Sequence, residues 1–287
     1  MNYRHAFHAG NFADVMKHVF LVRILVHLQR KQTPFRVIDT HAGSGLYDLT
    51  AEEAERTREW WEGVGRLDEP FAPAVEELIA PYRAILAKLH GRDPSAYPGS
   101  PFIARELLRR QDRAIFVELH RADYAALARH FARDRLAKAL HLDGWTALHA
   151  LVPPKERRGL ALIDPPYEEP GELTRLAAEM AKALRKWPTG IFMGWYPIKD
   201  PADVERPAAM LAEAAGHKGL RLELMIDASA APERLNGCGI FVLNPPWILS
   251  EEAELILPAL AERLARASFG AFRCEPLAAA IDSQPSG

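Results

Sequence analysis

The feature that most constrains the fold is a recurring pattern in which a short, mostly apolar run ends in an acidic residue. Four such runs occur before residue 170, and they end at Asp39, Glu118, Asp143 and Asp164. Runs of this length, separated by amphipathic helical stretches, are typical of buried parallel strands. A single acid could simply cap the following helix. Four in succession instead indicate one polar edge where the strands end, and α/β sheets bind their ligands at that edge.

Helical and extended patterns keep alternating beyond residue 167, which predicts an α/β fold of the Rossmann-like type with a mostly parallel, seven-stranded sheet. No helical pattern separates the two strands predicted at 220–226 and 239–243, so we expect an antiparallel pair there. The remaining elements predicted in this half are helices over 171–186, 201–215 and 251–266, a strand over 190–196 and a last strand near 270–274.

The length of 287 residues, of which 48% are hydrophobic and 26% charged, suits one large domain with an insertion. We predict four parts, namely an N-terminal arm (1–10), an α/β domain (11–49 and 96–274), a small helical insertion (50–95) and a flexible tail (275–287).

The insertion is predicted to hold helices over 51–66 and 73–90. Thr50 and Glu53 have the spacing of a capping box, and Gly91 is a plausible helix stop. Trp60 and Trp61 could close a small core of the insertion or cover RNA, and we favour the core.

Composition excludes several classes of protein. The two cysteines, Cys238 and Cys274, lie far apart, so we expect neither a disulfide framework nor a zinc site, and a reducing cytoplasm is the default. We expect no signal peptide, no membrane span and no metal, and a monomer. His5-x-x-His8 could form a metal pair, but ordinary loop histidines are favoured. A net charge of −2 argues against a protein that coats nucleic acid nonspecifically.

Positive charge is nevertheless concentrated locally. Within the first 36 residues the acid Asp14 accompanies the basic residues Arg4, Lys17, Arg23, Arg30, Lys31 and Arg36, and a second group, Lys155, Arg157 and Arg158, precedes strand 160–163. A solvated helix face with a basic loop and a nucleic-acid patch are both compatible with this pattern. Asn11 and Asp14 predict the start of a helix that runs to about Gln29.

The segment Asp164-Pro-Pro-Tyr167 closes the fourth of the apolar runs. The prolines restrict the backbone and fix the flanking groups in one arrangement. Asp164 and the Pro165 carbonyl could accept both hydrogens of a planar amino group, and Tyr167 offers a face on which a base stacks. This turn suits methyl transfer to an amine. The alternative is a proline-rich loop that only caps a strand.

Other segments fit a nucleoside-containing cofactor. Gly43 and Gly45 follow Asp39 and allow a tight turn near a ligand, although Asp48 stands where a dinucleotide fingerprint wants glycine or alanine. Glu118 could accept ribose hydroxyls and Asp143 an adenine amino group. We expect Ser100 to cap a helix, with Pro101 at its first position; offering its hydroxyl to a cofactor carboxylate is the alternative.

A rival for the catalytic turn is Asn244-Pro-Pro-Trp247, which also follows an apolar strand. The catalytic motif is expected after the fourth strand, where Asp164 stands, and Asn244 comes two strand–helix units later. We therefore favour Asp164 and predict that Asn244 forms a structural turn near the pocket rim.

Together these motifs closely resemble those of the bacterial J-type 23S ribosomal RNA adenine-N6 methyltransferases. The matching segments are Tyr3-Arg-His-Ala-Phe-His-Ala-Gly-Asn11, Ala13-Asp-Val-Met-Lys-His18, Asp39-Thr-His-Ala-Gly-Ser-Gly45, Tyr97-Pro-Gly-Ser-Pro101, Glu118-Leu-His120, Asp143-Gly144, Leu162-Ile-Asp-Pro-Pro-Tyr167, Trp195-Tyr-Pro197 and Asn244-Pro-Pro-Trp247. His41 departs from the aromatic residue of the generic first motif, and residues 60–95 match no segment of the family pattern.

The resemblance implies an S-adenosylmethionine-dependent methyltransferase fold and methylation of N6 of one adenine in 23S rRNA. It implies a cofactor site formed by His18, His41, Ser100, Glu118, Asp143, Gly144 and Asp164, with Asp164 catalytic. On the substrate side we place Tyr3, Lys17, Pro165 and Tyr167. The alternatives are a DNA adenine-N6 methyltransferase, a noncatalytic RNA-binding assembly factor on the same fold and, less favoured, a nicotinamide oxidoreductase.

Overall fold

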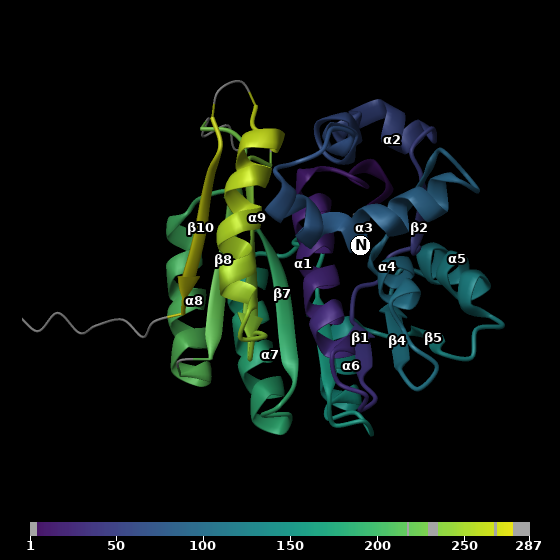
Figure 1. Ribbon diagram of the computed structural model, residues 1–287. Helices are drawn as coiled ribbons and strands as arrows, with labels where there is room; N and C mark the ends of the chain where they lie inside the picture. The colour runs from purple at the N-terminus through teal and green to yellow at the C-terminus, as the bar shows by residue number, and fades with distance from the viewer. Residues whose placement is uncertain (1–4, 217, 229–234, 267–268, 278–287) are drawn as a thin grey trace, which may run out of the picture.

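The computed structural model describes residues 5–216, 218–228, 235–266 and 269–277. Its centre is one eight-stranded sheet with the order β10-β8-β9-β7-β6-β1-β4-β5 (Figure 1). In that order the strands are β10 (Ala271–Pro276), β8 (Gly219–Met225), β9 (Gly237–Leu243), β7 (Ile191–Ile198), β6 (Gly159–Ile163), β1 (Arg36–Asp39), β4 (Arg113–Glu118) and β5 (Ala137–His141).

The prediction of a mostly parallel α/β sheet is confirmed, and the predicted antiparallel pairing of the strands near 220–226 and 239–243 is also confirmed. The predicted number of seven strands is wrong. β10 corresponds to the last strand predicted near 270–274, and it makes an eighth strand of the same sheet because it pairs antiparallel with β8, from Ala271 opposite Met225 to Pro276 opposite Leu220. Glu275 and Pro276 thus belong to the sheet and Leu277 is buried, so the tail predicted from residue 275 begins too early.

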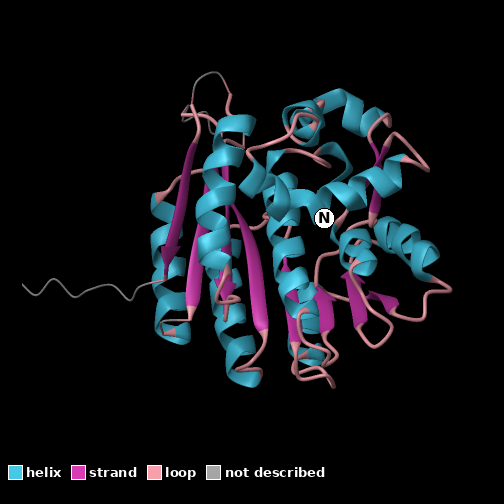
Figure 2. Ribbon diagram, viewed as in Figure 1, coloured by secondary structure: helices cyan, strands magenta, loops and turns pink. Residues whose placement is uncertain are grey.

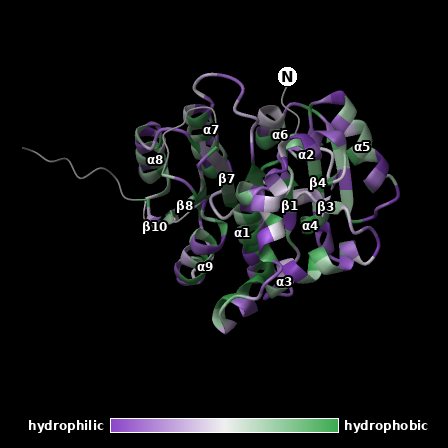
Figure 3. Cartoon of the chain, turned by 90° about the horizontal axis from the view of Figure 1, so that it is seen from above, coloured by the Kyte–Doolittle hydropathy of each residue, from purple (hydrophilic) through white to green (hydrophobic). Residues whose placement is uncertain are grey.

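Helices cover both faces of the sheet (Figure 2). One apolar core joins the sheet to α6 (Gly144–Leu151), α7 (Glu172–Lys186) and α8 (Ala202–Ala215). The other joins it to α1 (Phe12–Gln29), α4 (Ser100–Glu106), α5 (Arg121–Phe131) and α9 (Leu249–Leu264). Seen from above, α7 and α8 lie on one side of the strands and α1 and α9 on the other (Figure 3). No described helix has both the length and the apolar character needed to cross a bilayer.

Helix α1 begins as predicted. The Asn11 side chain accepts a hydrogen bond from the Asp14 backbone N–H at 3.0 Å, and the Asp14 carboxylate accepts one from Gly10 at 2.9 Å. The helix is buried on almost all sides, so the solvated helix face, one of the two interpretations of its basic residues, does not apply to this segment. Arg23, for example, lies buried and donates to both carboxylate oxygens of Glu252 at 2.8 and 2.6 Å.

The segment 50–95 contains α2 (Glu52–Thr57), two short 3₁₀ helices, η2 (Glu59–Glu62) and η3 (Val64–Leu67), and α3 (Pro73–His90). The single helix predicted over 51–66 is wrong because Arg58 adopts a left-handed conformation with φ of 52° and ends α2. The predicted capping box is also wrong, because the Thr50 hydroxyl donates to Asp48. Gly91 ends α3 as predicted.

Only one of the two adjacent tryptophans takes the core position that was favoured for the pair. Trp60 packs against the main core of the domain, whereas the side chain of Trp61 is 60% exposed. Two short strands that the sequence did not predict, β2 (Leu46–Asp48) and β3 (Ala96–Pro98), pair antiparallel on either side of segment 50–95 and join its ends.

Candidate active site

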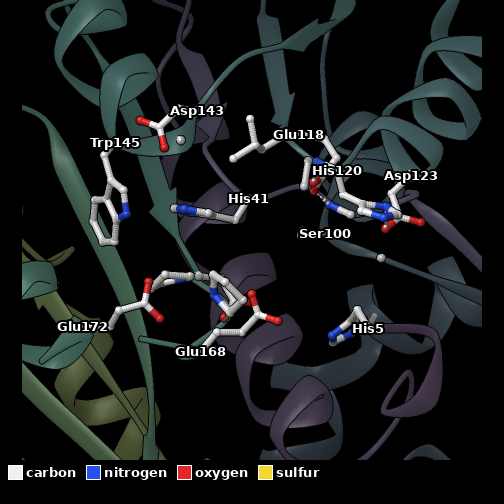
Figure 4. Close-up of a pocket in the computed structure, with 18 of the residues that line it drawn as sticks. His5, His41, Ser100, Glu118, His120, Asp123, Asp143, Trp145, Glu168 and Glu172 are labelled. Atoms are coloured by element: carbon white, nitrogen blue, oxygen red, sulfur yellow. Dashed lines mark hydrogen bonds and ion pairs between the residues drawn. The ribbon is translucent and has the colours of Figure 1, made fainter. Parts of the chain in front are cut away.

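The carboxyl ends of the parallel strands border a cavity of about 280 Å³ (Figure 4). The strand order places β6, β1, β4 and β5 next to one another, which brings their terminal acids to one edge. The residues predicted for the cofactor site all line this cavity, namely His18, His41, Ser100, Glu118, Asp143, Gly144 and Asp164.

Asp39 and Ser100 form a buried pair beside this cavity. The Ser100 hydroxyl donates to the Asp39 carboxylate at 2.7 Å, and Gly99 occupies the N-cap position of α4. The expectation that Ser100 caps the helix is therefore wrong, because a buried acid lies within reach of its hydroxyl. Burial raises the pKa of Asp39 to about 7, although the Ser100 hydroxyl acts in the opposite direction.

The glycine turn after β1 leads directly to Glu118. Gly43 has φ of 61°, and its N–H donates to one Glu118 oxygen at 2.8 Å, while the His120 N–H donates to the other at 2.6 Å. These bonds fix the carboxylate at the cavity wall. Burial raises the pKa of Glu118, with the two backbone bonds acting against the increase.

Asp143 combines the capping role and the site role that were weighed for it. Its carboxylate caps α6 by accepting from the Thr146 backbone N–H at 2.7 Å, and the residue also lines the cavity. At the next position, a Cβ on Gly144 would lie 2.4 Å from the Thr40 carbonyl oxygen and 2.6 Å from His41 Nε2. Glycine is therefore required for the close approach of α6 to the turn after β1.

The two predicted histidines are neutral polar groups in this site. Burial lowers the pKa of His18 to about 3 and that of His41 to about 4. His18 Nδ1 is 2.8 Å from the Tyr97 hydroxyl, which is 3.0 Å from the Tyr82 hydroxyl on α3. This chain of hydrogen bonds connects segment 50–95 to the cavity wall.

The turn after β6 separates two cavities. Asp164, Pro165 and Pro166 line both the first cavity and a second one of about 640 Å³. Tyr167 lines only the second, has φ of 54°, and donates its hydroxyl to the Trp195 carbonyl oxygen at 2.6 Å. This bond anchors the ring in the wall of the second cavity.

Lys17 lies buried between two carboxylates. Its ammonium is 2.6 Å from Asp164 Oδ2 and 2.8 Å from Asp14 Oδ1, and Asp14 also receives a hydrogen bond from His5 at 2.8 Å. Burial alone would lower the pKa of Lys17, but the two carboxylates raise it well above its usual value. Lys17 lines both cavities, with its charge committed to holding Asp164 in place.

Three further predictions concern Tyr3, the possible metal pair of His5 and His8, and the turn at Asn244. Tyr3 lies outside the described residues. The metal pair finds no support, since His5 bonds to Asp14, His8 bonds to Glu59 at 3.0 Å, and the described residues contain no cluster able to hold a metal.

Asn244 does form a structural turn, donating to the Pro188 and Gly190 carbonyls, but its predicted place near the pocket rim is wrong. β9 runs antiparallel to β7, so this turn lies at the opposite edge of the sheet.

The cavity also contains residues that the sequence interpretation missed. Trp145 contacts His41 edge to face, with ring centroids 5.3 Å apart, and the Arg175 guanidinium lies 4.7 Å from the Trp145 ring centre. Glu168 and Glu172 lie opposite Asp143 (Figure 4), and Glu169 also lines the cavity. Trp145 directly follows Asp143-Gly144, which was a usable signal, whereas Arg175 sits on an ordinary amphipathic helix.

Comparisons with known proteins show which family the chain resembles. The family model described as "Ribosomal RNA large subunit methyltransferase D, RlmJ" matches residues 32–277. The chain is 38% identical over 278 residues to ribosomal RNA large subunit methyltransferase J of Haemophilus influenzae, covering 96% of this chain and 98% of that protein. It is 39% identical over 271 residues to the Escherichia coli protein of the same name, covering 94% and 96%.

A solved structure has the same fold over nearly its whole length. The crystal structure of a Legionella pneumophila protein superposes with a TM-score of 0.84 and is 33% identical in sequence. The match covers 94% of this chain and 98% of that one.

Proposed function

The chain belongs to the RlmJ family of ribosomal RNA large subunit methyltransferases, and we propose that it methylates N6 of one adenine in 23S rRNA. Its cofactor is S-adenosylmethionine, which supplies an activated methyl group when bound. The observation that carries the choice of acceptor is the rigid turn Asp164–Tyr167, which lies between two adjoining cavities.

The first cavity fits the cofactor chemically. Glu118 is positioned by two backbone N–H groups and has the acceptor capacity for ribose hydroxyls. The acidic lining suits a ligand that carries positive charge, and one buried oxygen of Glu172 has no hydrogen-bond partner among the described residues. Gly144 lets α6 approach the cavity turn that holds His41, because a Cβ at this position would lie 2.6 Å from His41 Nε2. We assign the seven predicted residues to this cofactor site on these grounds.

The second cavity suits a flipped adenine. Lys17 binds Oδ2 of Asp164, which leaves Oδ1 to accept one hydrogen of an exocyclic amine, while the Pro165 carbonyl accepts the other. Two acceptors draw the nitrogen toward tetrahedral geometry and make its lone pair available for in-line attack. Tyr167, anchored through its hydroxyl, supplies a stacking face. We assign the catalytic role to Asp164.

The remaining expectations complete the proposal. We infer that residues 1–10 form an arm that contacts RNA, that 50–95 is an insertion into the α/β domain, and that the protein acts as a monomer in the cytoplasm on 23S rRNA. Lys17, Pro165 and Tyr167 line the second cavity, which supports their assignment to the substrate side.

The decisive experiment incubates the protein with methyl-labelled cofactor and unmodified 23S rRNA fragments, followed by nucleoside mapping. The expected product is N6-methyladenosine at one position. A competition arm with equal amounts of DNA fragments tests the DNA alternative, and calorimetric titration of the cofactor tests the noncatalytic one. Label on another base or on DNA, or absence of cofactor binding, contradicts the proposal.

A further inference from the structure

The edge of the sheet opposite the cavities is rich in exposed positive charge. The loops that lead into the parallel strands lie there, at the lower side in Figure 1. Each of the loops before β1, β4, β5, β6 and β8 exposes cationic side chains, namely Arg30, Lys31, Arg110, Arg133, Arg135, Lys155, Arg157 and Lys218. We call this set the basic edge.

Hydrogen bonds between loops show that much of the basic edge is one surface. The Arg109 guanidinium donates to the Gln29, Lys31 and Thr33 carbonyls, which joins the loop before β4 to the loop before β1. Arg158 donates to the Thr33 carbonyl at 3.1 Å and so joins the loop before β6 to the same place. Arginines with fixed partners thus build the framework that presents the free cations.

The acids in these loops do not neutralise the basic edge, because each is already paired with an arginine that is not one of its eight cations. Asp112 pairs with Arg109 at 2.8 Å and Glu156 with Arg36 at 2.8 Å. Asp134 pairs with Arg105 at 2.5 Å. Within the described part of the chain, the side chains of the basic edge make no hydrogen bond or ion pair, so their charge is available to an external anion.

An exposed aromatic side chain lies at the same end of the molecule. The Asn244 amide ties its turn to Pro188 and Gly190, and its backbone N–H donates to the Lys218 carbonyl at 2.8 Å. Trp247, three residues on, has 74% of its surface exposed, more than any other large apolar side chain of the described residues. Exposed cations beside an aromatic face are the combination that binds nucleic-acid strands.

We propose that the basic edge and Trp247 form a second RNA-contact surface, which binds the phosphate backbone of the substrate away from the methylated nucleotide. This inference rests on the proposed function. Strand β6 links Gly159 at the basic edge to Asp164 at the cavity, and at about 3.3 Å per residue the two ends are roughly 17 Å apart. The contacted phosphates therefore lie several nucleotides from the target adenine.

An RNA backbone fits this surface better than a membrane does. Membrane-surface binding needs a broad apolar face next to the cations, usually on an amphipathic helix. Here the cations sit on loops between strands, and Trp247 supplies an aromatic face suited to one base. The chain as a whole carries a net charge of −2, so attraction of a polyanion depends on local concentrations of positive charge such as this edge.

The test compares Arg30→Gln/Arg110→Gln with the matched control Arg92→Gln/Arg206→Gln, whose arginines are exposed outside the basic edge. Affinity for an unmodified 23S rRNA fragment is measured over a series of KCl concentrations. The edge variant should bind on the order of tenfold more weakly at 100 mM salt, and its salt slope should be shallower by roughly 1 to 2. The control should match the wild type.

Kinetics separate this surface from the catalytic site. For the edge variant we expect KM for the long fragment to rise on the order of tenfold with unchanged kcat, and a short hairpin that holds only the target loop to show no difference. Trp247→Ala should raise KM for the long fragment about fivefold. Equal salt slopes for edge variant and control, or reduced binding to anionic vesicles but not to RNA, would overturn the inference. Failure of the wild type to methylate either RNA would instead contradict the proposed function.

Discussion

The two edges of the same sheet differ in how their acidic side chains are paired with cations. At the cavity edge, Asp39 and Glu118 are buried and no cation of the described residues is bonded to them, and burial raises the pKa of both carboxyls. At the basic edge, Asp112 and Glu156 each have an arginine, and the surplus cations lie in solvent. A buried acid without a counterion lowers stability, so its presence at one edge only indicates a site kept for chemistry.

The largest difference is expected between substitutions in the two Pro-Pro turns, one at the cavity edge and one at the basic edge. Asp164→Ala removes the carboxylate that we propose accepts a hydrogen of the amine, and it should lower kcat for methylation of unmodified rRNA about a thousandfold. Asn244→Ala, in the corresponding turn at the basic edge, should leave kcat unchanged, because its side chain only ties loops together. Rates are measured with labelled cofactor. Full activity of Asp164→Ala, or a comparable loss in Asn244→Ala, contradicts the assignment.

The second largest difference is expected in the free energy of unfolding, between lysine substitutions at the two edges. Lys17→Met leaves the buried Asp14 and the partly buried Asp164 without their cation and should lower the free energy of unfolding by about 3 kcal/mol. Lys31→Met removes a solvated charge and should change it by less than about 0.5 kcal/mol. Urea unfolding at pH 7.5 gives both values. Similar values for the two variants would show that the Lys17 pairs contribute little.

Acid should weaken the cavity edge through its buried histidines. Burial lowers the pKa of His18 from its usual 6.5 to about 3, so the unfolded chain takes up this proton more readily. The stability contribution of neutral His18 is therefore complete above pH 6.5 and is lost as the pH falls toward 3. Asp39, with its raised pKa, acts in the opposite direction between pH 3.8 and 7.

The variant His18→Asn isolates this contribution. Between pH 7.5 and pH 5, the free energy of unfolding should fall by about 2 kcal/mol less in the variant than in the wild type. Urea titrations at the two pH values measure the difference. Parallel losses in both proteins would mean that His18 does not carry the acid sensitivity.

The smallest predicted effect concerns the space beside His41. Gly144→Ala places a methyl group 2.4 Å from the Thr40 carbonyl oxygen, closer than van der Waals contact, and should weaken cofactor binding about tenfold. Gly91→Ala is the control, since a Cβ at Gly91 meets its nearest atom at 3.5 Å. Calorimetric titration of the cofactor measures both. Unchanged affinity in Gly144→Ala would show that the neighbouring turn yields without disturbing the site.

The sequence predicted the strand ends well because hydrophobic period and terminal acids are local signals. It also predicted the start of α1, since Asn11 and Asp14 lie three residues apart. Ser100 was misjudged because its partner, Asp39, is 61 residues away and no local pattern distinguishes a capping serine from one that binds a buried acid. The left-handed conformation of Arg58 was also missed, because that conformation depends on the surrounding packing and not on a local pattern.

The position of Asn244 was a different kind of error. The antiparallel direction of the strand that precedes it was predicted, and this direction alone places the end of the strand at the edge opposite the cavities. The pairing of Lys17 with Asp164 could not be predicted, since it depends on how α1 packs across the sheet. The charge of the basic edge was visible only as separate clusters until the strand order brought the loops together.

The ion pair between Lys17 and Asp164 joins residues 147 positions apart. Closing so long a segment is slow compared with forming helices, because chain entropy is lost before the contact forms. When the denatured protein is diluted into buffer, methylation should therefore return later than the circular dichroism signal of its helices. The turn that we propose to hold the reacting amine is completed only when the first helix and the fourth strand of the parallel series have met.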